Sequence, residues 1–385
     1  MELKTRRKRK KNEEHFFDYT LLFIVLFLLG FGLVMLYSTS SYEASLNLND
    51  GGYYLKRQAG ATALGLVAMV IVSLIPYRFW ERFAMFGYVA TIIAIFLVKS
   101  PLGYSSGGAT SWFKVFGLSV QPAEIAKIAI ILFLASFICK MGKAINTLKG
   151  FAVILAIPLP ISGLIYVLTN NLSSAIIVFG IAAVMLFIAT NDYKKFVLLF
   201  LAGAAMVAVI IFLVVSQETD GMGFRGERIL AWLNPEAHAS GKGFQTLQAL
   251  YAIGSGGIFG KGLGQSMQKL GFIPEAQNDM IFSIICEELG LFGAISIILL
   301  FMILVWRCVV IANNASDMFG ALLVVGVMGH LSIQVILNIA VVTNTIPNTG
   351  ITLPFISYGG SSILFLLSEI GLVLSVSRGI ALKET

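Results

Sequence analysis

A succession of long apolar runs is the feature that most constrains this chain. A transmembrane helix needs about 20 mostly apolar residues. Stretches of about this length occupy ten ranges, 17–38, 58–76, 81–99, 122–140, 150–168, 172–190, 196–215, 280–306, 319–342 and 359–378. Only 12% of the 385 residues are charged, against about 25% in an average soluble domain. The sequence therefore predicts an all-α integral membrane protein with ten transmembrane helices.

Basic residues are distributed unevenly around these predicted helices. Seven of them lie in the run 4–11, directly before the first span. Such a run could bind nucleic acid, but beside a span it favours the cytoplasmic face of a membrane. With the N-terminus inside, the cytoplasmic segments carry nearly twice as many Lys and Arg as the outer ones. We therefore expect both termini in the cytoplasm, a retained first helix, and membrane lipid rather than nucleic acid around the basic run.

One loop, 216–279, is much longer than the others and is predicted to be extracellular, between the seventh and eighth helices. Long loops in compact domains are usually functional or disordered, and the helical spacing of apolar residues from Phe244 to Tyr251 argues against disorder. Its glycines do not fit a Walker phosphate loop, so we expect tight turns and close backbone packing. The predicted domains are a basic tail 1–16, a transmembrane domain 17–378 and a C-terminal tail 379–385.

Charged and amide side chains inside predicted spans are costly and usually functional. Glu124 and Lys127 lie three residues apart and share a helix face. They either form an ion pair that locks two helices or line a cavity for an anionic headgroup, and the sequence leaves both open. Gln334 and Asn338 place two amides on one face of the ninth span, which is typical of bridges between helices.

Asp279 stands where the long loop meets the eighth span. It could simply cap that helix, or it could be a carboxylate at the lipid–water border whose pKa rises toward that of a general base. Glu287 and Glu288 lie deeper in the same helix, where helix–helix hydrogen bonding is the expected role. The segment 347–362 is rich in Gly, Pro and Ser and predicts irregular backbone that is buried or lines a wet cavity.

Cysteine and histidine carry little information in this sequence. The three cysteines lie in or at the ends of apolar spans and do not form a disulfide framework. The three histidines are scattered without metal-ligand spacing, so no metal site is predicted.

Several long motifs resemble one family. They are QPAEIAK at 121–127, RILAWLNPE at 228–236, and further stretches at 243–269, 274–290, 334–350 and 351–362. On these motifs the chain resembles the SEDS family, which includes FtsW, RodA and SpoVE. Thr352, before Leu353 and Pro354, is more similar to the FtsW and SpoVE branch. Four positions depart from the family pattern, namely Ser111 in place of Arg, Asn171 in place of an acid, and Gln277-Asn278 in place of His-Thr.

The resemblance implies ten transmembrane helices with both ends in the cytoplasm of a bacterium. It implies a peptidoglycan glycosyltransferase that polymerises lipid II at the outer face of the cytoplasmic membrane, in division or sporulation. A class B penicillin-binding protein, which crosslinks the product, and other division proteins are the implied partners. The family's essential acid falls on Asp279, and its intramembrane acid and base match Glu124 and Lys127.

The expected chemistry is glycosyl transfer between two polyprenyl-diphosphate sugars, with Asp279 as general base. The diphosphate leaves as a stable anion and needs cations more than a general acid, unlike the leaving group in most glycoside hydrolases. Arg can hold phosphate oxygens in a bidentate way. The candidate diphosphate ligands are Lys127, Arg225, Arg228 and Lys269, and the wider predicted substrate site adds Glu124, Gln334, Ser357, Tyr358 and Ser361.

No cofactor is predicted with certainty, although a divalent cation at the diphosphate stays open. Two alternative functions also stay open. A lipid II flippase would suit the Glu124–Lys127 pair and a fifth span kinked by Pro158 and Pro160. A non-enzymatic scaffold for division proteins would tolerate loss of Asp279.

Overall fold

The computed structural model describes residues 16–380 except 102, 107–108, 116–117, 191 and 217–223. The basic run 4–11, nearly all of the predicted N-terminal tail and most of the C-terminal tail lie outside this part of the chain. Before the long loop, the helices are α2 (Tyr19–Leu48), α3 (Tyr53–Leu74), α4 (Tyr77–Glu81), α5 (Ala84–Leu97), α6 (Pro122–Met141), the 3₁₀ helix η1 (Gly142–Asn146), α7 (Leu148–Ala156), α8 (Pro158–Thr169), α9 (Leu172–Ala189) and α10 (Tyr193–Ser216). The later helices are α11 (Phe224–Leu233), α12 (Lys242–Gly256), α13 (Ile281–Asn313), α14 (Met318–Val342) and α15 (Gly360–Arg378).

The predicted spans correspond to helices in the structure. Among the described residues, nine helical stretches are long and apolar enough to cross a membrane, and α5 is a shorter apolar helix of 14 residues. α7, α8 and the residue between them form one of the nine stretches. The prediction of a helical, multi-pass membrane protein is confirmed, and the count of ten depends on including α5.

Helix α2 extends well beyond the predicted end of the first span. It has 30 residues and continues to Leu48, ten residues past the predicted boundary at Ser38. At 1.5 Å per residue it is about 45 Å long, whereas the hydrocarbon core is about 30 Å thick. Its Ser-, Thr- and Glu-containing last turns carry no apolar signal, so hydropathy alone ends the span too early.

Two helices are interrupted, each for an identifiable reason. Pro158 begins α8 with one residue between it and the end of α7, as predicted for the fifth span, because proline lacks the N–H that a continuous helix needs. Helix α13 is kinked at Gly290, whose φ of 66° is not helical. A Cβ at Gly290 would lie 2.5 Å from the Ile258 carbonyl oxygen, so only glycine fits this contact.

A small β-sheet stands between α5 and α6, and the all-α prediction missed it. Its antiparallel strands are β1 (Gly103–Ser106), β2 (Ala109–Val115) and β3 (Leu118–Val120), in the order β1-β2-β3. Phe113 of β2 is buried against Ala94 and Val98 at the end of α5. β1 and β3 have only four and three residues, and in the seven-residue β2 the adjacent Trp112 and Phe113 break the alternating pattern.

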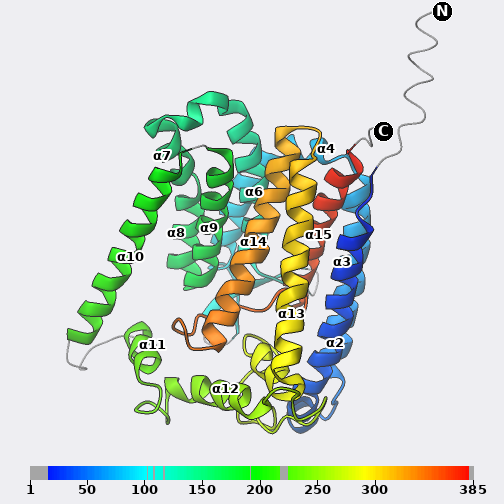
Figure 1. The fold of residues 1–385 in the computed structure, drawn as a ribbon, viewed down its shortest axis with the longest axis vertical. Helices are drawn as coiled ribbons and strands as arrows, with labels where there is room; N and C mark the ends of the chain where they lie inside the picture. The colour runs from blue at the N-terminus through cyan, green and yellow to red at the C-terminus, as the bar shows by residue number, and fades with distance from the viewer. Residues whose placement is uncertain are drawn as a thin grey trace, which may run out of the picture.

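Both described ends of the chain lie at the same end of the bundle, because the Phe16 N–H donates to the Ile380 carbonyl at 3.1 Å. Figure 1 shows α12 across the opposite end, where α13 begins, and α10 at one edge of the bundle. α14 and α15 are the most buried spans, whereas none of the described residues in the most apolar part of α10 is buried. The central helices therefore fix the positions of the polar groups described next.

Candidate active site at the start of α13

Asp279 precedes the first residue of α13 by two positions and is half-buried. Its side chain does not cap the helix, because Met280 is the N-cap residue and no side-chain cap is present. Gln245 of α12 donates to Asp279 Oδ1 at the long distance of 3.5 Å. Asp279 Oδ2 lies near the backbone of Gly350, 4.0 Å from where a Cβ would stand. The carboxylate is thus surrounded by protein while it keeps contact with solvent.

The backbone around Asp279 is held by Asn338 of α14. One amide group, Asn338 Nδ2, donates to the Asp279 carbonyl at 2.8 Å and to the Ile351 carbonyl at 2.7 Å. One turn earlier, Gln334 Nε2 donates to the Thr352 carbonyl at 3.0 Å. The two amides were predicted to bridge helices, and these bonds instead join α14 to non-helical backbone at Asp279 and at 351–352. They tie the start of α13 to the irregular segment that precedes α15.

Arg228 is the cation that the structure places beside Asp279. Its Nη1 donates to the Asn348 carbonyl at 3.2 Å, and the Asn348 side chain donates to Gln245 Oε1 at 3.0 Å. Arg228, Gln245 and Asn348 line a pocket of about 190 Å³ together with Trp232 and Phe244. This volume is below the 300–1,000 Å³ of typical small-molecule sites, so the pocket is small for a binding site.

The environment of Asp279 shifts its acidity. Burial raises the pKa of Asp279 from 3.8 to about 6, the charge of Glu275 adds to this, and the charge of Arg228 opposes it. A carboxylate with this pKa is mostly ionised at neutral pH and binds a proton more readily than an exposed aspartate does. The site therefore has the protonation behaviour that a general base needs.

Glu124 and Lys127 form a buried ion pair near the start of α6. Lys127 Nζ lies 2.8 Å from Glu124 Oε1, and the two side chains are 2% and 7% exposed. Gln334 Oε1 accepts from Lys127 Nζ at 3.4 Å, and Ser362 Oγ donates to Glu124 Oε2 at 3.3 Å. The structure thus supports the helix-locking interpretation and links the pair to α14 and α15.

This network continues deeper through two residues to which the sequence gave no role in the site. His330 Nε2 contacts Gln334 Oε1 at 2.8 Å, and His330 Nδ1 contacts Glu369 Oε2 at 2.7 Å. The Gln334 oxygen can only accept, so Nε2 must carry a proton. Both His330 and Glu369 are about 1% exposed. The four-residue spacing of His330 and Gln334 on one helix could have been noticed in the sequence, whereas the contact between His330 and Glu369, 39 residues apart, could not.

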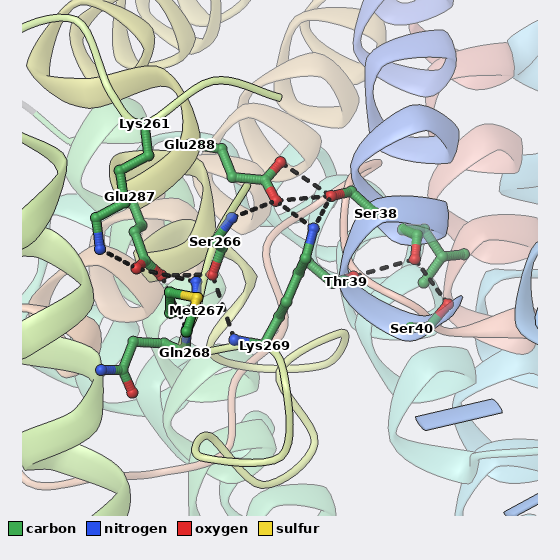
Figure 2. A network of polar contacts seen from close by, with 11 residues as sticks. Ser38, Thr39, Ser40, Lys261, Ser266, Met267, Gln268, Lys269, Glu287 and Glu288 are labelled. Carbon is green, nitrogen blue, oxygen red and sulfur yellow. Dashed lines mark hydrogen bonds and ion pairs between the residues drawn. The ribbon is translucent and has the colours of Figure 1, made fainter. Parts of the chain in front are cut away.

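Lys269, predicted to hold the diphosphate, lies instead in a separate buried cluster (Figure 2). Its Nζ is 2.7 Å from Glu288 Oε1 and 2.9 Å from Ser38 Oγ of α2, and its side chain is 7% exposed. Glu287 pairs with Lys261 at 2.6 Å. The cluster fastens the loop 261–269 to α13 and α2, so Lys269 has its charge satisfied by protein. The expected helix–helix hydrogen bond is seen between Glu288 and Ser38 of α2, whereas Glu287 bonds mainly to the loop.

Close backbone packing explains the glycines of the long loop. The Lys261 and Gly262 N–H groups donate to the Glu287 and Glu288 carbonyls, both at 2.9 Å. A Cβ on Gly260 would lie 2.1 Å from the Glu288 carbonyl oxygen. These backbone bonds reach α13 only because side chains are absent, as the sequence predicted.

Ser357, Tyr358 and Ser361 lie in or after the irregular segment before α15. The Tyr358 N–H donates to the Gln277 carbonyl at 2.9 Å, and Ser357 Oγ accepts from the Leu353 N–H at 2.8 Å. Among the described residues, buried Ser361 Oγ has no hydrogen-bond partner. Two of these residues therefore shape the segment beside Asp279. Arg225 belongs to α11, but its side chain lies outside the described part of the chain.

No group of three or more His, Cys, Asp or Glu residues that could hold a metal ion occurs in the described part of the chain. The three free cysteines are separate from Asp279 in the sequence and none is paired.

Comparison with known proteins decides the family. A family model described as "Cell cycle protein", covering FtsW, RodA and SpoVE, matches residues 19–381. The chain belongs to the FtsW/RodA/SpoVE family. It is 40% identical to stage V sporulation protein E of Bacillus subtilis over 363 residues, 94% of this chain and 97% of the relative. It is 39% identical to a probable peptidoglycan glycosyltransferase FtsW of Trichlorobacter lovleyi, over 95% of this chain and 94% of the relative.

Solved structures of this family share the fold. A chain from a peptidoglycan synthase complex that coordinates polymerization and crosslinking matches with a TM-score of 0.77 and 28% identity, over 94% of this chain and 98% of that chain. The rod shape determining protein RodA of Thermus thermophilus matches with a TM-score of 0.68 and 26% identity, over 94% and 97% of the two chains.

Proposed function

We propose that this protein is a peptidoglycan glycosyltransferase that polymerises lipid II at the outer face of the bacterial cytoplasmic membrane. The observation that carries the proposal is Asp279, a half-buried carboxylate at the start of a membrane-spanning helix, whose pKa is raised to about 6 beside Arg228. The names of FtsW relatives with near-complete coverage, which are probable peptidoglycan glycosyltransferases, support the same activity.

In the proposed reaction, the sugar hydroxyl of the acceptor lipid II attacks the anomeric carbon of the growing glycan. The new C–O bond forms as the bond to the lipid diphosphate breaks, and Asp279 takes the hydroxyl proton. Arg228 lies at the pocket and supplies positive charge for the departing diphosphate. A polar pocket next to apolar spans allows both lipid chains to stay in the bilayer while their heads react. Arg225, on the same helix as Arg228, is a second proposed contact.

Lys127 has a different proposed role. Its ammonium is satisfied by Glu124 and Gln334, and Gln334 also bonds the Thr352 carbonyl beside the site. We infer that Glu124, Lys127 and Gln334 hold the segment 351–352 in place, and that Lys127 stabilises the site without touching the diphosphate.

The proposed orientation has both termini in the cytoplasm and the Asp279 end outside. The shared location of the two described chain ends and the excess of basic residues on that side support it. A class B penicillin-binding protein is the proposed partner, supported by the match to a synthase complex that also crosslinks. A role in division or sporulation is supported by the FtsW and SpoVE relatives.

The proposal is tested by giving purified protein lipid II in detergent and separating any glycan strands on a gel. Wild type should make polymer, Asp279→Ala should make none, and Asp50→Ala, which alters an exposed aspartate paired with Lys56, should match wild type. Because detergent leaves no two sides to cross, a flippase would make no polymer. Absence of polymer from wild type, with and without a transpeptidase partner, would overturn the proposal.

A further inference from the structure

A second pocket lies at the opposite end of the bundle from Asp279. It has a volume of about 490 Å³ and stands between α4, the start of α5 and the last turns of α6. Tyr77 of α4 lies 3.1 Å from the Cβ position of Gly379, so this end also holds the described C-terminal residues. Figure 1 shows α4 at the end of the bundle that lies away from α12. The pocket is therefore remote from the proposed polymerase site.

The wall of this pocket carries a small excess of positive charge. Arg78, Arg82 and Lys140 line it together with one acid, Glu81. Arg78 is paired with Asp317 at 2.6 Å. Among the described residues, no carboxylate lies within ion-pair distance of Arg82 or Lys140. Two cations thus face one carboxylate, which leaves a net charge that suits a single monoanion.

The backbone adds to this charge. Ala84 and Met85, the first residues of α5, line the pocket. No side chain caps the N-terminus of this 14-residue helix. Uncapped N–H groups and the positive end of the helix dipole attract anions. The helix end and the two cations therefore act in the same direction.

The remaining wall of the pocket is apolar and faces the surroundings of the bundle. Met85 is 62% exposed, and Phe133 and Phe137 of α6 are half-buried. In a membrane-spanning chain such side chains lie against lipid tails. A ligand that fills the pocket must therefore join an anionic head to apolar chains.

We propose that this pocket binds the headgroup of an anionic phospholipid of the phosphatidylglycerol type. Arg82 and Lys140 contact the phosphate, and the acyl chains lie along Met85, Phe133 and Phe137. The headgroup hydroxyls donate to Glu81, whose carboxylate already accepts from Ser136 at 3.3 Å. In the orientation proposed above, the lipid belongs to the cytoplasmic leaflet, where basic pockets between helices bind anionic heads.

The test uses native mass spectrometry of the purified full chain in detergent. Phosphatidylglycerol, phosphatidylethanolamine and phosphatidylcholine with identical acyl chains are compared as added ligands. Phosphatidylglycerol should be retained at least about tenfold better than phosphatidylcholine, and Arg82→Gln with Lys140→Gln should lower that retention by roughly fivefold per charge removed. Where the double variant fails to fold, Lys140→Gln alone should show the single-charge loss.

A matched control removes the same charge elsewhere. Lys143→Gln with Lys149→Gln changes two exposed lysines at the same end of the bundle that do not line the pocket. This variant should retain phosphatidylglycerol as wild type does. An equal loss in both double variants would show unspecific attraction to a basic surface and overturn the proposal.

Two further measurements distinguish a phosphatidylglycerol headgroup from phosphatidylethanolamine and from inorganic phosphate. Glu81→Gln should keep or strengthen phosphatidylglycerol binding, because it removes a negative charge from the wall. Preference for phosphatidylethanolamine that Glu81→Gln abolishes would overturn the proposal in favour of an amine-binding site. Thermal stabilisation by inorganic phosphate equal to that by phosphatidylglycerol would overturn the lipid assignment. None of these readouts depends on polymerase activity, so they can fail independently of the proposed function.

Discussion

At the scale of single residues, the proposed glycosyl transfer depends on the pKa of Asp279. The same carboxylate in an exposed loop would be a weaker base, because ordinary aspartate has a pKa near 4. Desolvation by the surrounding protein produces the shift. Neighbouring charges then adjust it in opposite directions, which makes the effect of each neighbour predictable in sign.

Polymerisation should therefore depend on pH through this group. The ionised form is the base, so the rate should be constant above about pH 7 and fall about tenfold per pH unit below about 6. Glu275→Gln removes a negative charge that raises the pKa of Asp279. The midpoint of the rate profile should consequently move to lower pH. A profile that stays flat down to pH 5 in wild type would contradict the assignment.

The stability of the protein should respond to Asp279 in the opposite sense from its activity. A carboxyl whose pKa is raised on folding favours the folded state while protonated, and this contribution is lost as pH rises from about 4 to 6. Asp279→Asn should thus be up to about 3 kcal/mol more stable than wild type above pH 6 and equal to it below pH 4. Thermal unfolding in detergent at pH 4 and pH 8 measures this. A lower melting temperature for Asp279→Asn at pH 8 would contradict it.

At the scale of elements, the kink of α13 and the glycine loop form one unit. Gly290→Ala should destabilise the protein by about 2 kcal/mol or more, because Gly290 has positive φ and its Cβ would meet the Ile258 carbonyl. Gly254→Ala is the matched control, since a Cβ at this α12 position meets nothing within 4 Å and alanine favours helix. Thermal unfolding of both variants checks this, and equal melting temperatures would contradict it.

The cluster of Figure 2 separates a structural lysine from a substrate-binding one. Lys269→Met leaves Glu288 charged and unpaired, and breaking such a buried pair costs about 3–5 kcal/mol. Lys269→Met with Glu288→Leu removes both charges and should recover stability and polymer formation together. Were Lys269 a diphosphate ligand, the double variant would fold and stay inactive.

At the scale of the whole molecule, hydropathy was enough to locate the helices. Hydropathy did not predict where the helices end, since α2 continues through polar turns to Leu48. It also did not predict the β-sheet, whose strands are short. The position of Asp279 at the junction of the long loop and a span is visible in the sequence, but its assignment as the essential acid came from the resemblance to the family. The pocket residues Gln245 and Asn348 could not be predicted, because neutral amides 103 residues apart gave no signal and meet only in the folded chain.

Lys269 shows the other limit of sequence reasoning. A basic residue on the long loop is a reasonable phosphate ligand by composition, but its partner Glu288 lies 19 residues further along the chain, within α13. The sequence shows that a charged side chain needs an ion-pair or hydrogen-bond partner, but only the folded structure identifies that partner. The same holds for Lys127, where the near partner at i,i+3 was visible and Gln334 was not.

The most direct test of the central claim is the yield of glycan strands from lipid II per amount of folded protein, for wild type and Asp279→Asn at pH 7.5. The substitution keeps the size of the side chain and removes its ability to take a proton. If Asp279 is the general base, wild type should make polymer and Asp279→Asn should make none above background. The variant should be at least as stable as wild type. Wild-type yield from folded Asp279→Asn protein would contradict this role of Asp279.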